Sequence, residues 1–180
     1  MELISEALFK EYSPIKTDTN IEDFTPYIGI AQTMYINKVL GKPLLKELED
    51  QIKAASDNPD AVPYPITAEN KALLRMIAPA LSFYAVYQGL PFHWAAIVNK
   101  GVTIRESENS KGVDVKDIAQ LRRWLKDDAE FLLNQLIEYL CECGKSYPLW
   151  KPGTYCGGCG CDGDTPAKTF DTGIFIPKRR

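Results

Sequence analysis

The sequence predicts a mainly α-helical fold: a helical bundle with a short β-hairpin or strand element and an irregular, cysteine-rich C-terminal extension. Three observations predict it. Apolar residues recur at spacings of three and four over most of the chain, one short β-branched stretch surrounds a glycine, and five cysteines are confined to residues 141–161. Because the helical patterns end near residue 147, we expect a helical core over residues 1–147 and an extension with an extended tail over residues 148–180.

The composition is that of a globular protein with one core. The chain has 180 residues, of which 45% are hydrophobic and 25% charged. A net charge of -3 argues against a general nucleic-acid binder, which usually carries a basic face. No apolar run is long enough to cross a bilayer, and the acidic N-terminus lacks the features of a secretion signal. We therefore expect a protein that works in a cytoplasm, or in an assembly built there, without a membrane partner.

The first half of the chain predicts helices with marked ends. Residues 5–12 have the pattern of a short amphipathic helix. Thr25 followed by Pro26 is typical of a helix start, a capping hydroxyl before a proline in the first turn. This helix is expected to end at Gly41, where glycine can adopt the left-handed cap, and another begins at once with Pro43.

The middle of the chain predicts a loop and then a buried helix. The proline-rich residues 56–66 form the loop, and Thr67 caps a helix that is expected to run to Gly89. Pro79 lies inside this helix. Since an interior proline costs about 3 kcal/mol, a kink or break is expected there.

The next stretch predicts the β-element. Residues 96–98 and 102–105 lie on either side of a turn that contains Gly101, which favours two short strands, or one strand after an irregular entry. The polar residues 106–112 then lead into the longest helix.

The longest helical pattern runs from Asp114 to Cys141, and we expect Asp114 to cap it by accepting the amide of Asp117. Its apolar residues lie on one side and its charged residues on the other. Toward the C-terminus the apolar sector widens, which predicts contact with more than one neighbour, either in the core or in another subunit. The inward stripe comprises Ile118, Leu121, Leu125, Leu132, Leu136 and Leu140, the wide end adds Phe131, Leu133, Ile137 and Tyr139, and the solvated face comprises Arg122, Arg123, Lys126, Asp127, Glu130, Asn134 and Glu138.

The cysteines are the candidate metal ligands. Cys156 and Cys159 are separated by two glycines, the form of a metal knuckle, and Cys141 and Cys143 would complete a four-sulfur tetrahedral zinc site. A structural zinc ion would stabilise the extension, since such sites are worth on the order of 10 kcal/mol in peptides. The alternative is a set of reduced thiols in a glycine-rich loop, because an odd number of clustered cysteines is a poor disulfide framework. The residues leave both open.

No catalytic set is visible. His93 is the one histidine, flanked by aromatic residues and without an obvious acid partner nearby, so we expect a structural role for it. No phosphate loop, nucleophile elbow or dinucleotide fingerprint occurs. We therefore expect a protein that is not an enzyme.

The C-terminal residues are apolar and basic. Phe170, Ile174 and Ile176 share the parity of one strand face, and the basic run Lys178 to Arg180 follows. Such a segment docks on a partner or forms a strap over its own domain, and the sequence leaves both open.

Three stretches resemble the small helical head–tail connector (adaptor or neck) proteins of tailed bacteriophages. The first, from Phe24 to Leu48, has a helix, a Leu-Gly break and a second helix. The second is the buried helix that leads into the segment Gly101–Ile104. The third is the polar loop before the long helix, which Tyr147-Pro148-Leu149-Trp150 closes. The resemblance covers roughly residues 1–150 and does not require the cysteine segment.

This resemblance implies a structural virion protein. Identical subunits would form a ring beneath the portal protein, bind a tail or second connector protein, and line a channel through which DNA passes without sequence-specific binding. The protein would be assembled in the host cytoplasm and located in the virion. A closed ring needs two different faces on each subunit. The alternative function is a small zinc-binding adaptor that recruits protein or nucleic acid through residues 141–161.

Overall fold

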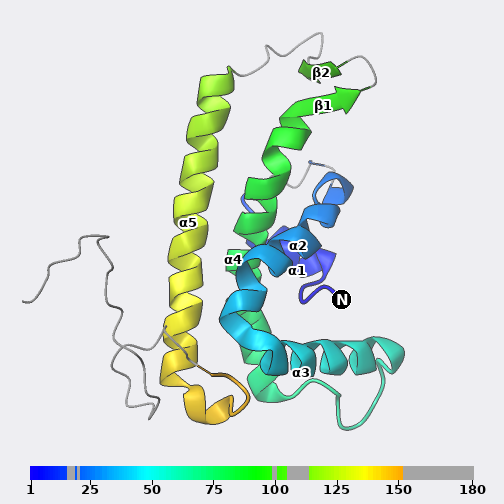
Figure 1. Ribbon diagram of the computed structural model, residues 1–180. Coiled ribbons are helices and arrows are strands. Elements are labelled where there is room, and N and C mark those ends of the chain that lie inside the picture. Colours follow the sequence, from blue (N-terminus) through cyan, green and yellow to red (C-terminus); the bar gives the residue numbers. More distant parts are fainter. Residues whose placement is uncertain (16–18, 20, 99–100, 105–113, 152–180) are drawn as a thin grey trace, which may run out of the picture.

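The computed structural model of the protein describes residues 1–15, 19, 21–98, 101–104 and 114–151, and these are mainly α-helical, as predicted (Figure 1). In chain order the elements are α1 (Glu6–Tyr12), the 3-10 turn η1 (Ile21–Asp23), α2 (Thr25–Ala31), the π-helix η2 (Gln32–Ile36), α3 (Asn37–Asp57), α4 (Ala68–Trp94), β1 (Ala95–Val98), β2 (Gly101–Ile104), α5 (Val115–Glu142) and the 3-10 turn η3 (Gly144–Ser146).

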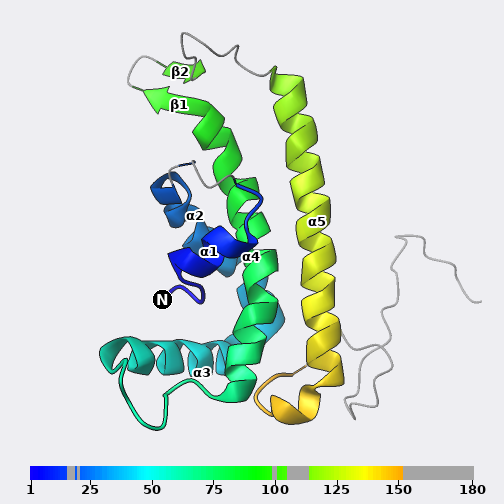
Figure 2. The ribbon, with the colours of Figure 1, turned by 180° about the vertical axis from the view of Figure 1, so that it is seen from behind.

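Two long helices organise the molecule. α4 and α5 lie side by side and run in opposite directions, and the hairpin β1–β2 lies beyond one end of α4 (Figures 1 and 2). α1 and α2 pack on the other side of α4 from α5, while α3 projects from the end of α4 that is opposite the hairpin, on the side away from α5 (Figures 1 and 2). α4 is therefore the central element, with α5 on one side and the N-terminal helices on the other.

α4 continues through the proline that was expected to interrupt it. Thr67 caps the helix as predicted, its hydroxyl accepting the Asn70 amide at 3.2 Å. The helix then passes Pro79 without a break and ends at Trp94 instead of Gly89. A Cβ at position 89 would lie 2.7 Å from the Phe24 ring, so this glycine serves the close approach of the chain before α2 and does not end α4.

The β-element is a hairpin, one of the two predicted forms. β1 and β2 pair antiparallel, with Ala95 opposite Ile104 and Val98 opposite Gly101. Because the hairpin lies between the long helices in sequence, it marks the end at which the chain reverses direction.

The predicted break at Gly41 is confirmed. Gly41 has φ of +72°, a backbone conformation that favours glycine, and it separates the two segments of α3. The expected capping role of Thr25 is wrong. Thr25 is the first residue of α2, and its hydroxyl donates back to the carbonyl of Ile21 at 3.3 Å because η1 places that acceptor within reach.

The chain after α5 folds back onto the helices. The Trp150 indole N–H donates to the Val39 carbonyl at 2.9 Å, and the Tyr147 hydroxyl donates to the Glu69 carbonyl at 2.8 Å. Both side chains are buried in the core. The core thus extends to Trp150, while most of the predicted extension, residues 152–180, lies outside the described residues, so the boundary at 147 stays a prediction.

Candidate functional site

α5 contacts α4 through a narrow stripe. Its buried residues are Leu125, Ala129, Leu136 and Leu140, which share one side of the helix. Three of them belong to the predicted inward stripe, but Leu121 of that stripe is exposed, which corrects the prediction. The reason is that α5 carries apolar residues on two adjacent sides and α4 covers one of them.

The uncovered side of α5 carries the candidate functional surface. Eight exposed residues recur at alternating spacings of four and three, so they follow one side of the helix for about 38 Å at 1.5 Å per residue. We call this set the acidic stripe. Its members are Asp117, Leu121, Trp124, Asp128, Phe131, Gln135, Glu138 and Glu142.

The acidic stripe combines aromatic rings with carboxylates and contains no basic residue. Trp124 is 58% exposed and Phe131 is 62% exposed, whereas the other residues of the wide apolar sector, Leu133, Ile137 and Tyr139, are partly buried against the core. Among the described residues, none of the stripe's carboxylates forms an ion pair; the pair on α5, Lys126 with Glu130 at 3.2 Å, is outside the stripe. The stripe therefore offers apolar area and unneutralised negative charge together.

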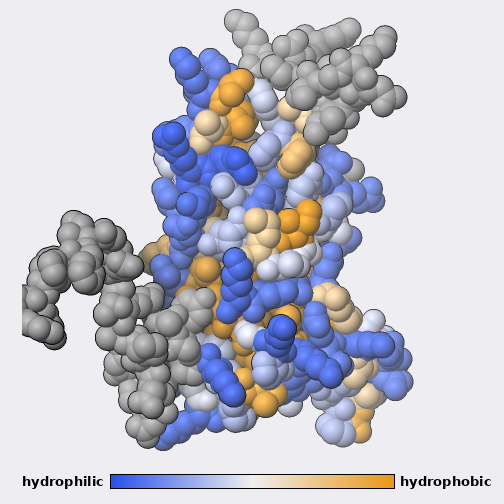
Figure 3. Space-filling view, viewed as in Figure 1, coloured by the Kyte–Doolittle hydropathy of each residue, from blue (hydrophilic) through white to orange (hydrophobic). Residues whose placement is uncertain are grey.

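A second apolar surface lies on the other side of α4. Tyr27, Ile30 and Met34 recur along α2 and η2, and Phe92 of α4 stacks on Tyr27 with ring centroids 5.7 Å apart. Ile30, Met34 and Phe92 are each nearly half exposed. We call these four residues the α2 surface. Figure 3 shows hydrophobic side chains over α2 and, separately, over the end of α5 near the hairpin.

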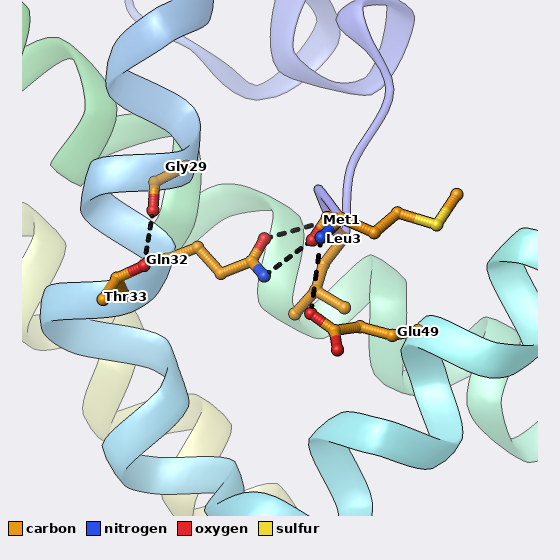
Figure 4. Close-up of polar contacts among 6 residues, drawn as sticks. All are labelled: Met1, Leu3, Gly29, Gln32, Thr33 and Glu49. Carbon is orange, nitrogen blue, oxygen red and sulfur yellow. Dashed lines mark hydrogen bonds and ion pairs between the residues drawn. The ribbon is translucent and has the colours of Figure 1, made fainter.

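The π-helix η2 fixes the α2 surface in place through Gln32. The Gln32 side chain is buried, and its amide accepts from the Leu3 amide at 2.9 Å and donates to the Met1 carbonyl at 3.0 Å (Figure 4). The Met1 amino group lies 3.6 Å from a Glu49 carboxylate oxygen. One side chain thus satisfies two backbone groups, which ties the N-terminal segment to α2.

An apolar groove lies where α4 ends and α5 begins. Its volume is ≈ 350 Å³, and Arg122 closes one side of it. Arg122 was expected on the solvated face, but it is half-buried: its guanidinium lies 4.4 Å from the centre of the Tyr87 ring and its Nε donates to the Tyr87 carbonyl at 3.3 Å. The correction follows from cation–π packing, which favours an arginine over an aromatic face. The groove is lined by Pro91, Phe92, Trp94, Ala95, Val115, Ile118, Ala119 and Arg122.

Burial shifts the ionisation of two tyrosines among the described residues. Burial raises the pKa of Tyr84 to about 12, with smaller contributions from the negative charge of Glu130 and from Tyr35, whose ring stacks 3.8 Å away. Burial also raises the pKa of Tyr147, and its hydrogen bond with Tyr139 adds to the shift. Both groups lie inside the helix packing, so they bear on stability and not on the exposed surfaces.

The predicted zinc ligands are only partly described. Cys143 is a free thiol and Cys141 is disulfide-bonded, contrary to the expectation of reduced thiols; both are half-buried at the end of α5. Cys156 and Cys159 lie outside the described residues, and the part of the chain that is described contains no group of three potential metal ligands. The zinc site stays a prediction, and it would require Cys141 to be reduced.

His93 packs as a structural histidine, but the expected lack of an acid partner is wrong. Its Nδ1 lies 3.4 Å from an Asp23 carboxylate oxygen, without the alignment of a hydrogen bond, and its ring contacts Phe24 at 5.0 Å between centroids. Asp23 is distant in sequence and reaches His93 only because α2 packs on α4.

The comparisons with known proteins place the chain in a family. Residues 36–160 match the Family of unknown function (DUF6712). The chain belongs to this family. No curated protein and no solved structure matches the chain. None of the helices within the described residues could span a membrane.

The DUF6712 match covers one of the two exposed surfaces. It includes α3, α4, the hairpin and α5 with the whole acidic stripe, and it ends within the cysteine segment. α1, α2 and the tail residues 170–180 lie outside it. The acidic stripe is thus part of the family match, whereas most of the α2 surface is not.

Neither exposed surface was predicted from the sequence as a separate feature. The signal for the acidic stripe was present, since Asp117, Trp124 and Phe131 recur every seven residues, which places them on one side of a helix. The sequence does not show which side of α5 packs against α4. The α2 surface had no comparable signal, because Phe92 comes to Tyr27 only through tertiary packing.

Proposed function

We propose that the protein is a structural subunit that assembles with copies of itself into a ring. The observation that carries this proposal is the acidic stripe, where Trp124 and Phe131 remain more than half exposed on a helix anchored by four buried residues. Large exposed aromatic side chains that lie together are typical of interaction sites, because covering them removes apolar area from water at about 25 cal/mol per Å².

The placement of the two surfaces supports a ring over a two-fold dimer. α5, which carries the acidic stripe, lies on one side of α4, and α2, which carries most of the α2 surface, packs on the other side (Figures 1 and 2). Two different faces on opposite sides suit a head-to-tail contact, which closes into a ring when the rotation allows it. A two-fold dimer would use one face twice.

We propose further that this ring is a head–tail connector of a tailed bacteriophage virion. The basis is the resemblance of residues 1–150 in the order of their parts: early helices with a break at Gly41, a buried helix, a hairpin and a long final helix. The portal protein and a tail or second connector protein would then be its partners. A negatively charged chain would let DNA pass along the channel without adhering, since phosphates bind clusters of Lys and Arg.

The oligomeric state tests this proposal. Sedimentation velocity and light scattering of the full chain should reveal a large oligomer, and negative-stain electron microscopy should reveal rings. Changing Phe131→Ser or Met34→Ser should shift the population toward monomers, because each removes apolar area from one face. Tyr64→Ser is the matched control, since Tyr64 is also about half exposed but lies in the loop between α3 and α4.

A monomer at every concentration, with and without a purified phage portal protein, would contradict the proposal. Rings that form equally well in the Phe131→Ser and Met34→Ser chains would contradict the two faces named here.

A further inference from the structure

The chemistry of the acidic stripe restricts what can cover it. Asp117, Asp128, Glu138 and Glu142 lie along the same side as the exposed rings, with no basic residue among them. Nucleic acid and anionic lipid would be repelled by these carboxylates. A protein segment that is both apolar and basic would bury the rings and neutralise the charge.

One segment of this chain has that chemistry. In residues 170–180, Phe170, Ile174 and Ile176 are apolar residues of the same parity, and Lys178, Arg179 and Arg180 follow, with Asp171 as the one acidic residue. Three basic and one acidic side chain leave a net charge of +2 on the segment. The charge is thus opposite to that of the stripe.

The extended segment from Phe170 to Ile176 is also long enough to cover the aromatic part of the stripe. An extended chain from Phe170 to Ile176 covers about 20 Å at 3.3 Å per residue, and the helix from Leu121 to Phe131 covers about 15 Å at 1.5 Å per residue. The basic residues that follow Ile176 would then lie beyond the aromatic part of the stripe, where its end carboxylates are. The nine residues from Asp162 to Phe170, which follow the last cysteine, span about 30 Å when extended, twice the length (about 15 Å) of the aromatic part of the stripe.

We propose that residues 170–180 of one copy lie along the acidic stripe of a neighbouring copy and link the subunits. This inference rests on the proposed function, because it assumes that copies associate. Residues 170–180 would cover the exposed rings of the stripe, and their positive charge would favour binding to its carboxylates. The segment from Asp162 to Phe170 is long enough to leave its own subunit, so the contact does not require the tail to fold back.

Charge reversal in the full-length chain tests the inference. The first variant carries Asp117→Lys, Asp128→Lys and Glu138→Lys on the stripe. The second carries Lys178→Glu, Arg179→Glu and Arg180→Glu in the tail. All changed residues of the first variant are exposed, so its thermal unfolding should stay close to that of the parent. Glu11→Lys, Asp57→Lys and Asp60→Lys form the matched control, three exposed acidic residues outside α5.

Each variant alone should associate at least about tenfold more weakly than the parent chain in sedimentation experiments at low salt, because three attractive pairs become repulsive. The control should associate like the parent. A mixture of the two variants should regain association, since the acidic tail of the second matches the basic stripe of the first. Only a contact between copies gives recovery on mixing.

The other results overturn the inference in distinguishable ways. If the parent associates and both variants associate equally well, the tail does not cover the stripe, although the proposed ring stands. If both variants fail, their mixture fails, and a chain with all six changes recovers, the tail covers its own helix. If the parent chain does not associate at all, the proposed function fails and this inference fails with it.

Discussion

α4 and α5 are nearly equal in length but differ in how much of their surface the fold covers. Twelve residues of α4 are buried, compared with four of α5. α4 lies between α5 on one side and α1 and α2 on the other, whereas α4 is the main packing partner of α5 among the described helices. Both carry apolar residues on more than one side, so the difference lies in the number of neighbours. A helix with one main neighbour has spare apolar surface that can serve assembly.

The largest expected effect is the difference in stability between a substitution in the buried side of α4 and one in the exposed side of α5. Leu81→Ala in α4 should lower the free energy of unfolding by about 2–5 kcal/mol, because the side chain is fully buried and leaves a cavity. Leu121→Ala in the acidic stripe should cost less than about 1 kcal/mol, since Leu121 is already 40% exposed. Urea denaturation of both variants measures the difference. Equal losses would show that α5 is covered as fully as α4.

A pH dependence should distinguish buried from exposed tyrosines. The pKa of Tyr84 is about 12 in the folded protein and about 10 when unfolded. Since the folded pKa is raised, the contribution of Tyr84 to stability is complete below pH 10 and is lost as the pH rises to 12, by about 2–3 kcal/mol at 1.36 kcal/mol per unit. Denaturation across that pH range checks this, and Tyr84→Phe should reduce the slope. Tyr64→Phe, at an exposed position, should leave the slope as it was.

The stability of the protein should respond differently to the same substitution at the buried Trp150 and at the exposed Trp124. Trp150→Phe should cost about 1–3 kcal/mol, because it removes the indole donor and leaves the Val39 carbonyl unsatisfied in a buried position. Trp124→Phe should change stability by less than about 0.5 kcal/mol, since Trp124 is largely exposed. Thermal unfolding monitored by circular dichroism would detect the difference. A comparable loss in both would mean that Trp124 has a partner within its own subunit.

The smallest predicted effect concerns the N-terminal segment. Gln32→Met, which is close in size, removes both the acceptor for the Leu3 amide and the donor to the Met1 carbonyl, so a loss of about 1 kcal/mol in the free energy of unfolding is expected. Hydrogen exchange at the Leu3 amide should become faster. Gln135→Met in the acidic stripe is the matched control and should leave that exchange unchanged. Unchanged protection at Leu3 in both variants would contradict the role given to Gln32.

Local signals predicted much of the fold because they act over a few residues. Thr67, Gly41 and Asp114 mark helix ends as expected, although the Asp114 carboxylate accepts the amide of Lys116 instead of Asp117. Local signals failed at Thr25 and at Gly89. In both cases a residue from another element supplied the partner, the Ile21 carbonyl or the Phe24 ring.

The sequence by itself determined that the last helix is long and two-sided, because the periods of three and four along Asp114 to Cys141 place each residue on a known side of a helix. Which of those sides would be covered was decided only by the tertiary structure. α4 takes Leu125, Leu136 and Leu140 and leaves Trp124 and Phe131 in solvent. The periodicity of the sequence shows which residues share a side of the helix, but the number and position of the neighbouring helices determine which side is buried.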